Sequence, residues 1–184
     1  MQELSLNILD IAQNSIKAGA SLVQIEIEED RAKDFMRIAV IDDGCGMDEE
    51  TQRRVTDPFY TTRTTRKVGL GVPFFKMQSE MAGGQFSIRS RVGQGTFIQG
   101  TFVRSHIDRM PLGDMAGTYC SLVMVNESTD FLYTHTVDGR SFAADTREFK
   151  QVLEGVSLAT PQVLEFIREY IQEHLTELYG GVIE

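Results

Sequence analysis

The first residues of the chain place apolar side chains at a helical period. They recur at spacings of three and four: Leu4, Ile8, Ile11, Ala12 and Ile16. This spacing predicts a helix over residues 3–18 with one apolar face. The other face carries four polar side chains: Asn7, Asp10, Asn14 and Lys17. Such a face is commonly a solvated surface, so a function for it needs support from elsewhere in the chain.

After this helix come segments in which apolar and polar residues alternate, separated by glycines. They predict strands over 22–29, 35–42, 85–91 and 96–103, a short helix over 48–56 and a longer helix over 73–82. Pro73 suits a first helical turn, and Gly83-Gly84 suits its end. We expect Phe74, Phe75 and Met77 of this helix to pack in the core. The pattern predicts an α/β, two-layer sandwich: one mixed sheet with helices on one face.

The second half of the chain predicts further elements. Residues 104–114 are a connection, followed by strands over 119–125, 131–137 and 141–144, and by helices over 145–153 and 160–179. Asp145 is a candidate helix cap, and Thr160-Pro161 opens the last helix. The apolar stripe of that helix packs on the added strands, or forms a surface for a partner or a second copy. We expect two units: residues 1–104, and an α+β extension over 105–184.

Composition narrows the class of protein. The chain has 184 residues, of which 41% are hydrophobic and 24% charged, and its net charge is −9. It contains no apolar run near the roughly 20 residues that span a bilayer, so we expect a cytoplasmic protein with no membrane partner. Two cysteines exclude a disulfide framework. Cys45 is expected to be a small filler, the alternative being a redox-sensitive thiol. The negative charge makes nucleic acid an unlikely partner.

A short acidic and glycine-rich motif carries the first chemical signal. The run Asp42-Asp43-Gly44-Cys45-Gly46-Met47 comes directly after an apolar strand. A carboxylate at a strand end can accept the exocyclic N–H of adenine, and glycines allow the backbone to pass close beneath a purine. Taken alone, the same run is more typical of an ordinary tight turn.

A second glycine motif opens a helix. Gly69-Leu70-Gly71 follows the basic residues Arg63, Arg66 and Lys67, and free N–H groups at a helix start attract phosphate. The alternative is an exposed, solvated loop. On the first helix, the Asn14 carbonyl is a hard oxygen ligand suited to Mg²⁺. Lys17 could meet phosphate, and Asp10 is placed to polarise a water molecule.

Order and spacing connect these segments. They are Asp10 to Ala20, Asp42 to Met47, Asp57 to Arg63, Gly69 to Val72 and Gly93 to Thr96. In this order they resemble the conserved boxes of the GHKL ATPases, which include gyrase, the ninety-kilodalton heat-shock chaperone, histidine kinases and mismatch-repair ATPases. The first two segments look like the mismatch-repair type, and the others look like histidine kinases. The resemblance covers about residues 1–104 and implies a Bergerat-type ATP-binding fold.

The resemblance implies ATP and Mg²⁺ as ligands. It implies that Asn14 coordinates the metal, that Asp42 binds adenine and that Thr96 supports the adenine contact. It implies further nucleotide-binding positions: Lys17, Gly44, Gly46, Met47, Thr62, Arg63, Gly69, Leu70 and Gly71. Asp10 holds the catalytic position, where hydrolytic members carry Glu. Because its side chain is shorter, the sequence predicts ATP binding and leaves turnover open.

We do not expect the histidine-kinase likeness to extend to a phosphoacceptor. Such kinases phosphorylate a histidine that precedes the ATP domain, whereas only nine residues precede Asp10. His106, His135 and His174 follow the motifs, and we expect each at the surface or half-buried. The sequence predicts a stand-alone Mg-ATP-binding module, a slow ATPase or nucleotide-dependent switch acting on a regulatory protein partner. The alternatives are a protein kinase that phosphorylates a separate protein, as anti-sigma-factor kinases do, and a purely structural domain.

Overall fold

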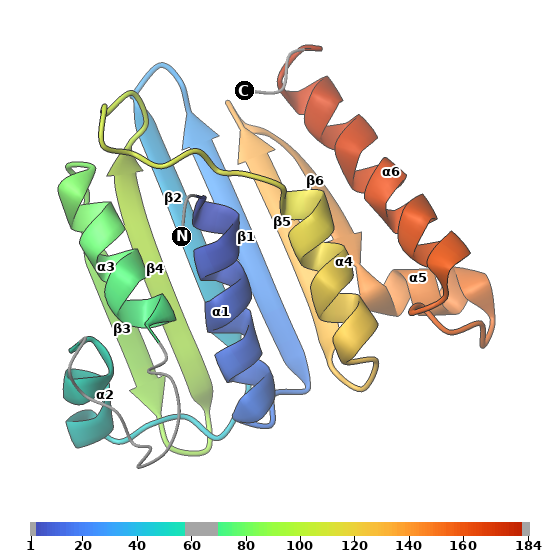
Figure 1. Ribbon diagram of the computed structural model, residues 1–184, viewed down its shortest axis with the longest axis horizontal. Helices are drawn as coiled ribbons and strands as arrows, with labels where there is room; N and C mark the ends of the chain where they lie inside the picture. The colour runs from blue at the N-terminus through green and yellow to red at the C-terminus, as the bar shows by residue number, and fades with distance from the viewer. Residues whose placement is uncertain (1–2, 58–69, 182–184) are drawn as a thin grey trace.

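A computed structural model describes residues 3–57 and 70–181 (Figure 1). Its helices are α1 Leu4–Lys17, α2 Glu49–Val55, α3 Gly71–Met81, α4 Met115–Val125, α5 Thr146–Leu153 and α6 Pro161–Leu178. Its strands are β1 Leu22–Asp30, β2 Phe35–Asp42, β3 Phe86–Arg91, β4 Gly95–Val103, β5 Asp130–Val137 and β6 Arg140–Asp145. In this described part of the chain, no helix has the length and apolar character needed to cross a membrane.

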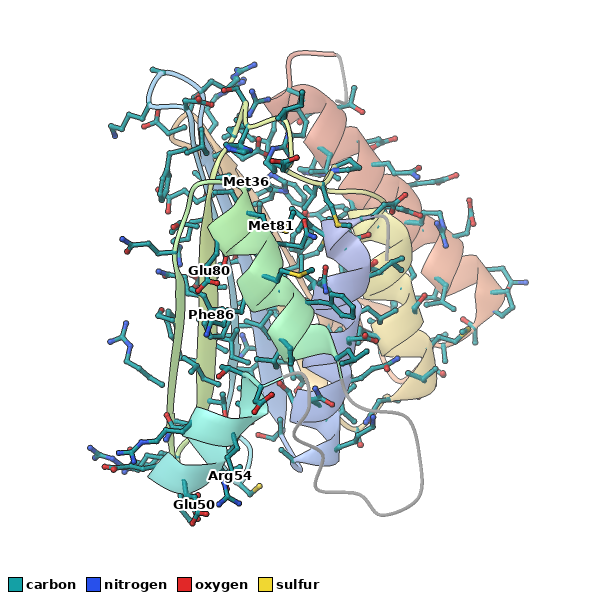
Figure 2. The ribbon with its side chains drawn as sticks, turned by 60° about the vertical axis from the view of Figure 1, so that its left-hand side comes forward. Met36, Glu50, Arg54, Glu80, Met81 and Phe86 are labelled. Atoms are coloured by element: carbon teal, nitrogen blue, oxygen red, sulfur yellow. The ribbon has the colours of Figure 1, made fainter. Side chains whose placement is uncertain are left out.

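The strands form one mixed sheet in the order β3-β4-β2-β1-β5-β6. Neighbours are antiparallel except β1 and β5, which run parallel. Helices α1, α3 and α4 lie side by side on one face, and α6 packs beside α4 (Figure 1). The other face of the sheet carries side chains and no described helix (Figure 2). The predicted two-layer sandwich is therefore confirmed, and strands from residues 105–184 continue its sheet.

The core lies between this sheet and its helices. Along β1, the buried positions alternate with half-buried ones, as period-two packing against one covered face requires. Phe75 of α3 is fully buried, as expected from its helical spacing, whereas Met77 is 40% exposed. The core position expected for Met77 is wrong, because two residues advance a helix to nearly its opposite side.

Residues 119–125 are helical, and the expected strand there is wrong. They belong to α4, which Asp114 caps by accepting the Gly117 N–H at 2.8 Å. The helix packs against α1 and α6, so apolar residues line more than one of its sides. Such a run has no clear helical period, and a short apolar run cannot be assigned to helix or strand by periodicity alone.

The other expected ends of helices lie close to those observed. Helix α3 begins at Gly71, two residues before Pro73, which still falls in the first turn, where its missing N–H costs nothing. Asp145 caps α5 by accepting the Arg147 N–H at 2.9 Å. Helix α6 begins at Pro161 as predicted, and its apolar stripe packs on β5, β6 and α4.

A buried polar cluster joins the two halves of the chain. Glu29, 5% exposed on β1, accepts hydrogen bonds from Tyr179 after α6 and from Arg104 Nε at 2.9 Å. His135 on β5 lies 3.1 Å from Glu29 through Nε2 and 2.6 Å from the Tyr133 hydroxyl through Nδ1. Because His135 is fully buried, its expected surface or half-buried position is wrong.

This cluster predicts an acid-sensitive stability. Burial alone would raise the pKa of Glu29, but hydrogen bonds from His135, Tyr179 and Arg104 lower it from 4.5 to about 2. A lowered carboxyl pKa gives stability above the unfolded-state pKa, and that stability is lost as the pH falls through the folded-state pKa. The wild type should therefore lose up to about 3 kcal/mol of unfolding free energy between pH 5 and pH 2 through this group.

Urea unfolding of wild type and Glu29→Gln across that range measures the effect. The Glu29→Gln curve should lack this part of the pH dependence, while Glu49→Gln, at a side chain that is 88% exposed, should keep it. Parallel curves for wild type and Glu29→Gln would show that Glu29 is not the group responsible.

Candidate functional site

The polar face of α1 carries three of the predicted site residues. Asn14 and Lys17 are exposed, and Asp10 is half-buried. Burial raises the pKa of Asp10, while the charge of Lys17 acts in the opposite direction. A higher pKa makes a carboxylate a stronger base, so Asp10 is the group on this face that is suited to accept a proton from water.

The start of α3 lies directly against this face. A Cβ atom on Gly71 would stand 2.7 Å from the Cβ of Asp10, so only glycine allows this approach. Leu70, half-buried, precedes the helix and supplies no side-chain cap. The first N–H groups of α3 therefore lack a side-chain acceptor at the cap position, beside Asp10, as phosphate binding at a helix start would require. Other predicted residues lie outside the described part of the chain: Thr62, Arg63, Arg66, Lys67 and Gly69.

The carboxylate of Asp42 is held in a fixed orientation at the end of β2. Its Oδ2 accepts the Ser15 hydroxyl at 2.6 Å, and its Oδ1 accepts the Gly44 N–H at 2.9 Å. Ser15 is buried on α1, directly after Asn14. Each carboxylate oxygen has two acceptor positions, so Asp42 can still accept the amine of a purine.

The glycine-rich loop after Asp42 lies between the end of α1 and the turn that joins β3 to β4. Cys45 donates its N–H to Ala18 O at 2.9 Å and accepts the Gly93 N–H at 2.8 Å. Gly46 has φ +66°, and a Cβ there would stand 2.0 Å from Arg91 O. Gly44 also lies close to Ala18. These contacts fix the path of the backbone beside Asp42.

Thr96 lies opposite Asp42 in the β2–β4 register. The Ser90 hydroxyl on β3 lies 2.9 Å from both the Thr96 hydroxyl and Gly95 O, and it accepts the Met47 N–H at 2.8 Å. One serine thus joins the glycine-rich loop to the Gly-Thr motif. The structure brings Asp42, Met47 and Thr96 together around it.

A hollow of about 800 Å³ opens at this end of the sheet. Five of its lining residues come from the motifs: Asp42, Met47, Gln94, Gly95 and Thr96. Others include Ile41, Gln52, Ser90, Arg89 and Phe97. Asp10, Asn14 and Lys17 do not line this hollow. They lie on α1, which Ser15 connects to Asp42.

Sequence reasoning missed four residues that shape this site: Ser15, Asp43, Gln52 and Ser90. Asp43 accepts the N–H groups of Ser21 and Leu22 at 2.7 and 2.9 Å, which anchors the loop to the start of β1. Ser15 is a polar residue within the apolar stripe of the first helix, and that position could have indicated its role. No local pattern marks Gln52, because its partners lie on a distant strand.

Comparison with known proteins agrees with this geometry. A family model described as histidine kinase-, DNA gyrase B-, and HSP90-like ATPase matches residues 2–106. The chain belongs to this family. It is a GHKL ATP-binding module, and the suspected resemblance is confirmed.

Two curated relatives are sensor kinases of Pseudomonas aeruginosa. Sensor histidine kinase AruS is 31% identical over 102 residues, covering 52% of this chain and 10% of AruS. Sensor protein kinase FleS is 36% identical over 89 residues, which cover 48% of this chain and 22% of FleS. The chain thus matches a quarter or less of each relative's length.

A solved structure shows the same fold. The MutL ATPase domain of Aquifex aeolicus, complexed with ADP, superposes with a TM-score of 0.51 at 13% identity, over 84% of this chain and 70% of that one. The expected fold class is therefore confirmed.

Two glycines of the β3–β4 turn allow a matched test of the site's geometry. Gly95 has φ +94°, and a Cβ there would stand 1.9 Å from Asp42 O, whereas Gly93 has φ +78° and open space around it. Both alanine variants carry backbone strain of about 1 kcal/mol, but only Gly95→Ala also separates β4 from Asp42. We expect Gly95→Ala to lower the melting temperature several degrees more than Gly93→Ala. Equal melting temperatures would contradict this close approach.

Proposed function

We propose that this chain binds Mg-ATP at the site described above and acts as a slow ATPase or nucleotide-dependent switch on a protein partner. The observation that carries the proposal is the Asp42 carboxylate, which Ser15 and Gly44 orient opposite Thr96. A strand-end carboxylate held in this way, within an ATPase family, is suited to the exocyclic amine of adenine.

The adenine end of the site consists of Asp42 with the loop and hairpin around it. Asp42 would accept the amine N–H, and Thr96 would support the same edge of the base. Gly44 and Gly46 would allow the base to lie close to the backbone. Met47, held through its N–H by Ser90, would contribute apolar contact.

The phosphate end would lie along α1 and the start of α3. Among the described residues, no group of three or more His, Cys, Asp or Glu side chains could hold a metal ion. This fits Mg²⁺, which commonly takes one or two protein ligands and completes its shell with phosphate and water. The exposed Asn14 amide would be the protein ligand, with Lys17 and the first N–H groups of α3 meeting phosphate.

Asp10 would polarise the attacking water, and its shorter reach supports slow turnover. Misplacement by about 1 Å can cost on the order of a hundredfold in rate. Slow hydrolysis suits a switch whose state depends on the bound nucleotide, and residues 105–184 would offer the partner a surface.

The second candidate function is a protein kinase that transfers the γ-phosphate to a separate protein. Two relatives named as sensor kinases favour it. The burial of His135, with both ring nitrogens engaged, argues against that residue as an acceptor. In this candidate function the phosphate acceptor lies on another protein.

Purified protein incubated with Mg²⁺ and γ-labelled ATP, with and without lysate of the source cell, separates these functions. Free labelled phosphate indicates an ATPase, and label on one lysate protein indicates a kinase. Asp42→Asn should bind ATP on the order of a hundredfold more weakly, because a hydrogen bond to a charged acceptor is lost, and it should abolish either signal. ATP affinity equal to wild type in Asp42→Asn would refute the adenine assignment.

Variants at Asp10 test the catalytic step separately. Asp10→Asn should keep ATP affinity within about threefold and lower phosphate release by on the order of a hundredfold, since general-base catalysis is lost. Asp10→Glu should raise phosphate release if side-chain reach limits the rate. Single-turnover release of labelled phosphate measures both. An unchanged rate in Asp10→Asn would remove Asp10 from the chemistry.

A further inference from the structure

We propose that Gln52 on α2 is a positioning residue for adenine recognition. Its side-chain amide holds Ser90, and through Ser90 it sets the positions of Met47 and Thr96 beside Asp42. The inference rests on the proposed function, ATP binding at Asp42, and it assigns a role to a residue whose amide contacts Ser90 and Met47.

The Gln52 amide makes two hydrogen bonds to the backbone of Ser90 at the edge of β3, a contact that we call the clamp. Gln52 Nε2 donates to Ser90 O at 2.8 Å, and Gln52 Oε1 accepts the Ser90 N–H at 2.9 Å. Strand β3 is at the end of the sheet, with β4 as its one neighbour, so these backbone groups face away from the ladder. The amide fills the place that a further strand would occupy. A third contact, from Nε2 to Met47 O at 3.3 Å, includes the glycine-rich loop.

Ser90 in turn contacts Met47 and Thr96, two of the residues predicted to bind adenine. Its hydroxyl accepts the Met47 N–H and lies 2.9 Å from the Thr96 hydroxyl, and Ser90 is opposite Thr96 in the β3–β4 register. A shift of Ser90 along or away from the strand would therefore move both groups. Because hydrogen bonds depend steeply on distance and angle, small shifts are enough to weaken recognition of the base.

Helix α2 packs against β3, and its Val55 is partly buried against the core. None of its residues is fully buried. Arg53 pairs with Glu49, and Arg54 pairs with Glu50 in the same helix, where Figure 2 labels both residues of this second pair. The hollow of about 800 Å³ and a second of about 620 Å³ both have Gln52 in their lining. With open space on two sides, the clamp has a larger share in fixing Ser90 than it would in a packed interior.

Three variants test this role: Gln52→Leu, Gln52→Glu and the control Arg53→Ala, at a side chain that is 80% exposed on the same helix. The ligands are ATP and purine riboside triphosphate, whose base lacks the exocyclic amine. Gln52→Leu should bind ATP about tenfold more weakly and the amine-free analogue less than threefold more weakly. Arg53→Ala should match wild type for both ligands.

Gln52→Glu adds a pH readout that a structural role would not give. Near pH 8 the new carboxylate cannot donate to Ser90 O, whereas a carboxyl that is protonated near pH 4, close to the ordinary Glu pKa, can donate and accept as the amide does. Relative to wild type at the same pH, ATP affinity should recover about fivefold or more on acidification. Asp48, Glu49, Arg89 and Arg91 line the first hollow with Gln52, and Arg53, Lys76 and Glu80 line the second. All of them are present in both proteins, so the ratio to wild type removes their effect.

The inference would be overturned if Gln52→Leu lost equal affinity for ATP and for the amine-free analogue. It would also be overturned if the ratio of ATP affinities of Gln52→Glu and wild type did not change with pH. If Gln52→Leu fails to fold, the Gln52→Glu ratio decides alone. The proposed function fails separately: in that case Asp42→Asn binds ATP like wild type. If Asp42→Asn loses ATP while both Gln52 variants match Arg53→Ala, only the role of Gln52 is wrong.

Discussion

The carboxylate of Asp42 is the group on which the geometry of this site depends. Its two oxygens accept one hydrogen bond from α1, through Ser15, and one from its own loop, through Gly44. The helix that carries Asn14 is thereby tied to the strand end that faces Thr96. A charged acceptor with two donors has little freedom to rotate, so the metal and adenine contacts proposed for this site share one rigid frame.

The sequence predicted those parts of the fold and the candidate site that depend on local chemistry. Helical spacing located α1 and α6, alternation located β1 and β2, and glycines with positive φ marked the turns. The same reasoning failed for α4, because packing against α1 and α6 removes the polar face that reveals a helix. It also missed Ser90 and Gln52, whose importance comes from pairing across 38 residues of sequence.

The cluster around Glu29 shows the same limit for stability. Its members are separated along the chain: Glu29, Arg104, Tyr133, His135 and Tyr179. Each has an ordinary residue type for a surface or half-buried position, and none belongs to a motif. The parallel pairing of β1 with β5 brings Glu29 near Tyr133 and His135, and Arg104 after β4 and Tyr179 after α6 complete the cluster. A buried carboxylate is tolerated there because each of its oxygens has a donor, which offsets the cost of removing it from water.

The contacts of α1 indicate that the proposed nucleotide site depends on residues beyond 104. Helix α1 has no side-chain cap at Glu3, and its Leu4 and Ser5 N–H groups instead donate to Pro111 O and Leu112 O at 3.0 and 2.8 Å. The connection over 104–114 crosses the start of α1 (Figure 1). Removing it would leave these donors unpaired, and removing β5 would expose the edge of β1. The helix that presents Asp10 and Asn14 is thus held from both ends, by Ser15 at Asp42 and by the second half of the chain.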